Sequence, residues 1–158
     1  TVLGNYTRDI VVKQDDADGT DEIFANVSGE LYRQTGGTAS NIPAYQTIED
    51  WTNSLTPGDS TWSVRAGVEY FPADDTVILC NAVDHKVYIV DAATGDVIQT
   101  LGSGDQGTAP GNFDQPSDAA VYSDGGTDYL VICNGAAKVT IYSKTNAASV
   151  QDWMLMEN

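Results

Sequence analysis

Ile78-Leu79-Cys80-Asn81 recurs 53 residues later as Val131-Ile132-Cys133-Asn134, and Ile23-Phe24-Ala25-Asn26 is an earlier version, 55 residues before the middle one. Each copy is a short run of strand-forming or small residues that ends in Asn. A recurrence with a period near fifty residues indicates one supersecondary unit that is stacked on copies of itself.

Each unit contains four short segments of strand type, rich in Val, Ile, Tyr and Thr and separated by Gly, Asp, Asn and Pro. Some, such as Lys86-Val87-Tyr88-Ile89-Val90, are so continuously apolar that we expect both faces of their sheet to be covered. The expected strands are 9–12, 23–26, 30–33 and 48–51 in the first unit, 66–68, 78–81, 86–90 and 98–101 in the second, and 119–121, 131–134, 138–142 and 150–153 in the third.

The repeat predicts the fold class. Units of about 40–50 residues with four strands each are typical of propeller blades. We predict one all-β repeat domain, a β-propeller or partial propeller of three four-stranded blades at about 1–55, 62–103 and 113–158. The alternative is three hairpin pairs in a β-sandwich. Propellers have 4–8 blades, whereas three units are found here. We expect the ring to be completed by the remaining blades of a larger chain or by other chains in a homo-oligomer, and the alternative is an open stack of blades.

The chain is strongly acidic, with 23 Asp and Glu against 7 Lys and Arg and a net charge of −16. Nucleic-acid binding needs clustered basic residues, so we predict no nucleic-acid partner. The sequence has no apolar run long enough to cross a bilayer, and we predict no membrane insertion.

Cys80 and Cys133 occupy the same position in neighbouring units. Equivalent positions in sheets packed face to face lie about 10 Å apart, whereas a disulfide needs Cα atoms within about 7 Å. We therefore expect two free, buried cysteines. Asn5-Tyr6-Thr7 is a candidate N-glycosylation site, and we interpret Asn26 as a turn residue instead.

An acidic loop separates the first two expected strands of the first unit, with the sequence Gln14-Asp15-Asp16-Ala17-Asp18-Gly19-Thr20-Asp21-Glu22. Ca²⁺ takes 6–8 oxygen ligands, and carboxylates spaced around a glycine bend could converge on one ion. The alternative is a solvated acidic turn. We interpret Asp74-Asp75 of the second unit as a plain turn. The predicted Ca²⁺ ligands are the side chains of Asp16, Asp18 and Asp21 and the carbonyl of Thr20, with water completing the shell.

At this loop the chain resembles the FG-GAP or VCBS type of blade, known from integrin α-chain propellers. The resemblance is carried by Asp16-Ala-Asp18-Gly-Thr-Asp21-Glu22-Ile23-Phe24, followed by Gly29-Glu-Leu31-Tyr32. Such blades carry a calcium loop of the form D-x-D/N-x-D-G-x-x-D between their first two strands. The resemblance implies a calcium-stabilised blade in an extracellular or cell-surface protein, with Gln14 at the first ligand position in place of Asp.

The second and third units resemble NHL blades over roughly 62–145. The linker Gly111-Asn-Phe113-Asp-Gln-Pro116 is similar to the G-x-F-x-x-P signature that leads into the first strand of such a blade. Several NHL-like propellers are lyases or hydrolases that use His, often with a metal. This chain has one His, His85, which we expect to be a surface turn residue, because one titratable group is not a catalytic constellation.

Trp51 and Trp153 hold equivalent positions in the fourth strand of their units. We expect them to pack against the next blade, and a sugar-stacking platform is the alternative. The sequence shows no nucleophile elbow or phosphate loop, so we predict no catalytic residues and no enzyme.

The sequence thus predicts a non-catalytic binding or assembly module outside the cell or at its surface, with a calcium-stabilised first blade. The expected partners are other protein chains, with glycans as a second class. The alternatives are a structural subunit of a homo-oligomer or filament, and a fragment of an NHL-like propeller enzyme, a lyase or hydrolase, or of a lectin.

Overall fold

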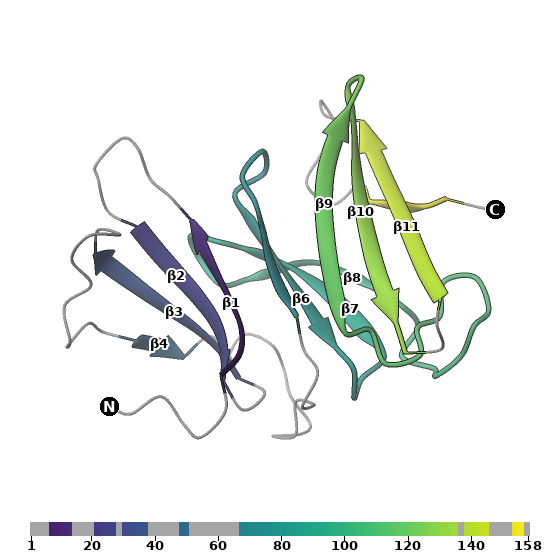
Figure 1. Ribbon diagram of the computed structural model, residues 1–158, viewed down its shortest axis with the longest axis horizontal. Coiled ribbons are helices and arrows are strands. Elements are labelled where there is room, and N and C mark those ends of the chain that lie inside the picture. Colours follow the sequence, from purple (N-terminus) through teal and green to yellow (C-terminus); the bar gives the residue numbers. More distant parts are fainter. Residues whose placement is uncertain are drawn as a thin grey trace.

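The structure, a computed structural model, describes residues 7–13, 21–27, 30–37, 48–50, 67–135, 138–145 and 153–156. Within these ranges the chain forms three four-stranded antiparallel sheets, one for each repeat unit (Figure 1). Sheet 1 contains β1 (Thr7–Lys13), β2 (Asp21–Val27), β3 (Glu30–Gly37) and β4 (Ile48–Asp50). Sheet 2 contains β5 (Val68–Phe71), β6 (Thr76–Asn81), β7 (Lys86–Asp91) and β8 (Val97–Leu101). Sheet 3 contains β9 (Asp118–Asp124), β10 (Thr127–Asn134), β11 (Lys138–Thr145) and β12 (Met154–Leu155).

The sheets follow one another like consecutive blades of a propeller, with sheet 2 between sheets 1 and 3 (Figure 1). Strands within each sheet lie in chain order. The first strand of the middle sheet, β5, contacts β1 on one side and β9 on the other. The three first strands therefore form a shared inner edge, and the all-β partial propeller of four-stranded blades is confirmed. The described ranges hold no helix that could cross a membrane.

Sheet 2 is covered on both faces, and every residue of β6 is buried. Because side chains alternate between the two faces of a strand, each face contacts a different neighbour. Leu79 packs with Phe24 of β2 on one face, and Ile78 packs with Leu130 and Ile132 of β10 on the other. Burial of each such side chain contributes about 1.5–3 kcal/mol, so the two apolar interfaces hold the blades together.

The linker between β8 and β9 inserts a side chain into the interface of sheets 2 and 3. Phe113 is fully buried there, with its ring centroid 6.2 Å from that of Tyr142. Gly102 makes this possible, because its φ is +95° and a Cβ would lie 2.7 Å from both the His85 carbonyl and the Phe113 ring. The segment that resembles an NHL linker thus fixes the third blade against the second.

Asp74 and Asp75, in the turn between β5 and β6, tie sheet 2 to both neighbours. Asp75 Oδ1 lies 2.7 Å from Lys13 Nζ of β1, and Asp74 forms an ion pair with Lys144 of β11. The Lys144 side chain is fully buried, and its Nζ lies 5.0 Å from the centroid of the Trp153 ring. The two residues lie in a turn, as predicted. The sequence did not predict that each carboxylate also binds a cation from a different blade.

The repeat alignment misplaces the first unit by one residue. Phe24 faces forward to sheet 2, whereas Leu79, its partner in the alignment, faces back to sheet 1. A slip of one residue exchanges the faces of a strand. In the third unit, the fourth strand described is Met154–Leu155, which pairs with Tyr142 and Ser143 of β11. It begins after Trp153, the residue at which we expected the fourth strand to end.

Both cysteines are free, as predicted, but only Cys80 is buried. Cys133 is exposed, which corrects the prediction of two buried thiols. It lies on the face of sheet 3 that points away from sheet 2, and no described residue covers that face. Trp153 is buried against Phe71 of sheet 2, with ring centroids 5.9 Å apart. It therefore packs against another blade, as predicted, but this is the preceding blade and not the next one.

Candidate active site

Three carboxylates lie along the inner edge, one from the first strand of each sheet. They are Asp9 of β1, Glu69 of β5 and Asp118 of β9, called here the inner-edge carboxylates. Asp9 Oδ2 accepts a hydrogen bond of 2.8 Å from the backbone N–H of Val68, the residue before Glu69. The packing of neighbouring blades therefore brings together acidic residues that are far apart in the sequence.

Gly67 allows the second and third blades to approach closely at this edge. Its N–H donates to the Ser117 carbonyl at 3.0 Å. A Cβ at position 67 would lie 2.6 Å from Asp118 Oδ1 and 2.8 Å from Asp118 Cα, so a larger residue would push Asp118 away. Asp118 Oδ1 also accepts a hydrogen bond of 2.9 Å from the Ala119 N–H, which fixes one side of the carboxylate.

Glu69 differs from its two neighbours in its electrostatic environment. Burial raises the pKa of its carboxyl group, and the negative charges of Asp118 and Asp9 raise it further. A carboxyl group of this kind retains its proton to a higher pH and can donate it as a general acid. A carboxyl group with a raised pKa beside two further acidic side chains is an arrangement that supports acid–base chemistry.

Cys80 lies near this edge, and the negative charge of Asp118 affects the pKa of its thiol. The thiol is nevertheless not a nucleophile. Burial raises the pKa of Cys80 far above its ordinary value, and the Asp118 charge adds to the effect. The thiolate is the reactive form of cysteine. The thiol is therefore a packing group, as the sequence predicted for this position.

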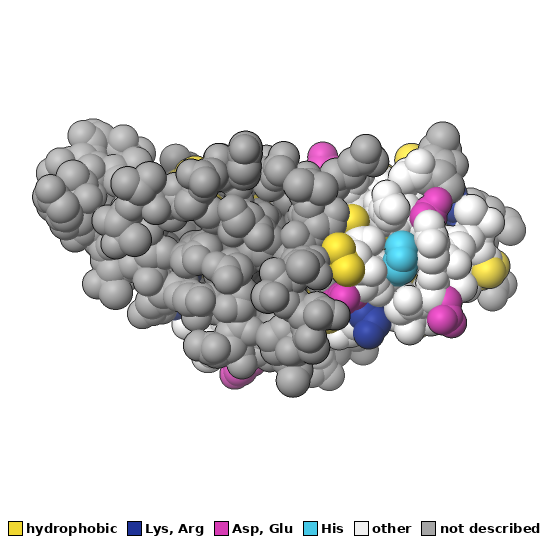
Figure 2. Space-filling model, turned by 90° about the horizontal axis from the view of Figure 1, so that it is seen from below, with side chains coloured by type: hydrophobic (Ala, Val, Ile, Leu, Met, Phe, Trp, Pro, Cys, Tyr) yellow, Lys and Arg dark blue, Asp and Glu magenta, His cyan; other side chains and the backbone are white. Residues whose placement is uncertain are grey.

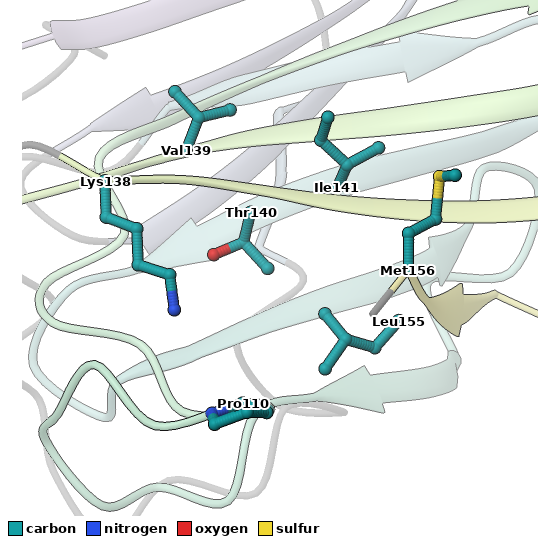
Figure 3. Close-up of a pocket in the computed structure, with 8 residues that line it drawn as sticks. Pro110, Lys138, Val139, Thr140, Ile141, Leu155 and Met156 are labelled. Atoms are coloured by element: carbon teal, nitrogen blue, oxygen red, sulfur yellow. The ribbon is translucent and has the colours of Figure 1, made fainter. Parts of the chain in front are cut away.

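A pocket with a volume of about 310 Å³ lies beside β11 and the residues that follow Trp153 (Figure 3). Figure 3 shows Lys138 and Thr140 pointing toward Pro110 and Leu155, while Val139 and Ile141 point to the other side of the strand. Lys138 Nζ donates to the Thr108 carbonyl at 2.8 Å. Lys138 is the one ionisable side chain of the lining, so this pocket carries no acid–base pair. It is lined by Pro110, Gly111, Lys138, Val139, Thr140, Ile141, Leu155 and Met156.

The predicted calcium ligands Gln14, Asp16, Asp18 and Thr20 lie outside the described residues, and Asp21 is the first residue of β2. The calcium site stays a prediction. Within the described ranges, no three His, Cys, Asp or Glu side chains are grouped to hold a metal ion, and this includes the inner-edge carboxylates.

His85 lies in the turn between β6 and β7 with a positive φ of 55°. Its Nδ1 accepts a hydrogen bond of 3.2 Å from the Gln115 N–H, so it joins this turn to the linker that precedes β9. On the face shown in Figure 2, the described side chains around the histidine are mixed in type. The structure supports the predicted turn position. Asn5 and Trp51 lie outside the described residues.

The sequence alone does not reveal the inner-edge carboxylates, because these residues belong to no motif. They are single acidic residues in three first strands, separated in the chain by 60 and 49 residues. One signal could have found them. In a propeller the first strands meet at the centre, so a carboxylate in each of them places three acidic groups around one axis.

No protein-family model matches the chain, and no curated protein matches its sequence. Its fold is similar to that of a solved GH43 glycoside hydrolase, engineered to display both endo-xylanase and exo-arabinofuranosidase activity, which is a β-propeller. The TM-score is 0.47 and the identity 13%, over 92% of this chain and 27% of that chain. The chain thus spans about a quarter of the length of that enzyme, and at this identity the likeness concerns the fold alone.

The comparison nevertheless corrects one prediction. We predicted that the chain is not an enzyme, and this prediction is contradicted because the matched propeller is an enzyme. The FG-GAP and NHL types of blade stay predictions, and what is shown is an all-β partial propeller.

Proposed function

We propose that the chain carries the acid–base centre of a β-propeller hydrolase that cleaves glycosidic bonds in neutral carbohydrates. The observation that supports this proposal is the convergence of Asp9, Glu69 and Asp118 at the inner edge of three adjacent blades. Glycoside hydrolysis needs two carboxyl groups, one protonated and one ionised.

The surroundings of each carboxyl group suggest its role. Glu69, with its raised pKa, would donate its proton to the oxygen of the leaving sugar. Asp118 is exposed and holds a backbone hydrogen bond on Oδ1, which leaves Oδ2 free to take a proton from the attacking water. The water oxygen forms the new bond to the anomeric carbon as the glycosidic bond breaks.

Asp9 is a positioning residue in this scheme. Its Oδ1 accepts from the Ile10 N–H at 2.9 Å and its Oδ2 from the Val68 N–H at 2.8 Å, so both oxygens are engaged. Its charge helps to raise the pKa of Glu69. The net charge of −16 would repel polyanionic chains, which favours a neutral substrate.

The test is hydrolysis of a panel of aryl glycosides and neutral polysaccharides by the parent and three variants. Glu69→Gln and Asp118→Asn should each lose about 10²–10⁴-fold in kcat, because each removes a proton-transfer group. Asp124→Asn, at the far end of β9 and exposed, is the matched control and should keep the parent rate. Absence of cleavage by the folded parent, or equal rates in Glu69→Gln and parent, would refute the proposal.

The pH dependence offers an independent check. Because Glu69 must be protonated, the hydrolysis rate should fall as pH rises through its raised pKa, which gives the pH–rate profile an alkaline limb. Asp9→Asn removes a negative charge near Glu69 and should move this alkaline limb to lower pH. An alkaline limb that stays in place in Asp9→Asn would argue against the role of Asp9.

We further propose, from the sequence, that the loop at 14–21 binds Ca²⁺ and that the protein works outside the cell. The clustered carboxylates and the FG-GAP-type resemblance support this. Calorimetry with Ca²⁺ should give binding heat for the parent and none for Asp18→Ala. Equal heats would rule out the site.

A further inference from the structure

The turn between β6 and β7 is held in one conformation by side chains of its own hairpin. Asn81 Oδ1 accepts hydrogen bonds of 3.0 Å from the backbone N–H groups of both Val83 and Asp84. The Asp84 carboxylate in turn accepts from Asn81 Nδ2 at 2.8 Å and from the Tyr88 hydroxyl at 3.0 Å. The next residue, His85, is therefore placed by a fixed framework.

The contact between His85 and Gln115 fixes the imidazole ring and the position of its proton. The Gln115 N–H donates to Nδ1 at 3.2 Å, so the ring proton of the neutral imidazole is on Nε2. Both residues have a positive φ, 55° and 54°, and neither is glycine. Such backbone strain persists where the surrounding contacts determine it, and it is common at ligand sites. The ring is partly exposed, and among the described residues none accepts a hydrogen bond from Nε2.

This ring lies at the end of the molecule where the inner-edge carboxylates are found. Asp118 is the first residue of β9, and Glu69 is the second residue of β5. The Cys80 N–H donates to the Gly67 carbonyl at 3.0 Å, so the turn after β6 lies at the end of sheet 2 where β5 begins. Figure 2 views the molecule from the end where β9 begins and shows the histidine at the surface.

The linker connects the ring to the acid–base centre over a short distance. Gln115 precedes Asp118 by three residues, so their Cα atoms lie at most about 11 Å apart. Pro116, which is buried, restricts the backbone between them. His85 bonds to this linker and not to the inner-edge carboxylates themselves. A substrate that reaches both the ring and the carboxylates must therefore extend beyond the sugar that reacts.

We propose that His85 binds the substrate of the acid–base centre by donating a hydrogen bond from Nε2 to a hydroxyl group of a sugar ring remote from the cleaved bond. This inference rests on the proposed function and narrows the substrate to neutral oligosaccharides and polysaccharides, as opposed to glycosides of a single sugar. Val83 of the same turn is 44% exposed and offers an apolar contact for the C–H surface of such a ring. The turn thus presents both kinds of contact that a sugar ring requires.

The test is calorimetric titration with cello-, manno- and xylo-oligosaccharides of two to five units, in the Glu69→Gln background so that none is cleaved. His85→Asn is the decisive variant. Asparagine tolerates a positive φ and its Oδ1 can accept from the Gln115 N–H, but it has no group at the place of Nε2. It should weaken binding of the longer oligosaccharides about 3–10-fold, the worth of one hydrogen bond, and leave that of the disaccharide unchanged. Asp96→Asn, in the turn at the other end of sheet 2, is the matched control and should bind every oligosaccharide like the background.

The dependence on chain length separates contact with the sugar from a role in the fold. An equal loss at every length would show that His85 acts through the fold alone. Equal affinities in His85→Asn and the background, or absence of binding in all three series, would likewise overturn the proposal. Circular dichroism of each variant confirms that it is folded.

Hydrolysis by the parent is measured separately, so the two proposals can fail independently. If the parent cleaves no glycoside but binding depends on His85 as described, the acid–base function fails and the sugar-binding role of His85 stands. If the parent cleaves oligosaccharides and His85→Asn has the same KM at every length, the role of His85 fails and the acid–base function stands.

Discussion

Sheets 2 and 3 are built from nearly the same sequence pattern but have different surroundings. In β6 all six residues are buried, whereas in β10 buried residues alternate with partly buried or exposed ones. Val87 of sheet 2 is completely buried and its counterpart Val139 is 52% exposed. The comparison shows that the repeat determines the strand and its register, whereas the neighbouring sheet determines burial.

The ionic contacts show the same difference. The turn between β5 and β6 gives one carboxylate to each neighbour, Asp75 to sheet 1 and Asp74 to sheet 3. In sheet 3 the corresponding turn holds Gly125 and Gly126, and neither can form such a pair. Sheet 2 is therefore the element that joins the array. Substitutions in the contacts between sheet 2 and its neighbours should therefore lower the free energy of unfolding. Equivalent substitutions on the face of sheet 3 that points away from sheet 2 should change it little.

The largest effect is expected at the buried pair of Lys144 and Asp74. Lys144→Met should lower the free energy of unfolding by about 3 kcal/mol, because it leaves the Asp74 carboxylate buried without its cation. Lys138→Met, at the other end of β11, should cost less than about 0.5 kcal/mol, since its contact is exposed. Urea denaturation measures both. Equal costs for the two variants would show that the buried pair does not join sheets 2 and 3.

A smaller effect is expected for one matched pair of apolar residues. Val87→Ala should lower the free energy of unfolding by about 2 kcal/mol, from lost burial and the cavity that remains. Val139→Ala should change it by less than about 0.5 kcal/mol under dilute conditions. The same chemical change is thus made at equivalent positions of two sheets. A comparable loss in both variants would mean that the sheet 3 face is already covered.

The smallest effect concerns the exposed joint between sheets 1 and 2. Burial would raise the pKa of Asp75, but the Lys13 ammonium and the Tyr70 hydroxyl outweigh it and lower the pKa below the ordinary 3.8. Burial would lower the pKa of Lys13, but Asp75 and Glu22 raise it above the ordinary 10.5. The stabilisation that ionised Asp75 gives to the folded state is therefore fully present above pH 3.8, and it is lost as pH falls through the lowered pKa of Asp75. That of Lys13 is complete below pH 10.5 and lost as pH rises through its raised pKa.

Asp75→Asn should therefore be less stable than the parent by under about 1 kcal/mol near neutral pH, and the difference should shrink as pH falls below 3.8. Thermal unfolding at several pH values measures this difference. The exposed Asp96, in the turn between β7 and β8, provides the control as Asp96→Asn. A difference that is the same at acid and neutral pH would show that Asp75 does not act through its charge.

Much of the fold could be predicted from the sequence because it depends on local patterns. The strands around Asn81 and Asn134 form where the repeat places them, and the second and third units agree in which face each residue presents. The first unit differs because side chains alternate between the two faces of a strand, so a slip of one residue moves each side chain to the other face. The alignment pairs Phe24 with Leu79, but Phe24 faces sheet 2 whereas Leu79 faces sheet 1.

The candidate site could not be predicted in the same way because it depends on contacts between units. Asp9, Glu69 and Asp118 become neighbours only when three blades pack along their first strands. The ion pairs of Asp74 and Asp75 could not be predicted either, since their cations Lys144 and Lys13 lie in other units. The exposure of Cys133 depends on the sheet that would cover it, which a repeat pattern alone does not reveal.

The contrast between a covered and an open face can be tested directly with the two native thiols. Labelling is carried out with a thiol reagent at a dilution where scattering gives the mass of one chain, and the labelled residue is identified by peptide mapping. We predict one rapid labelling event per chain, at Cys133, and reaction of Cys80 only when the protein unfolds. Rapid labelling of both thiols, or of Cys80 before Cys133, would contradict the packing of sheet 2 against sheet 3 and with it the partial propeller.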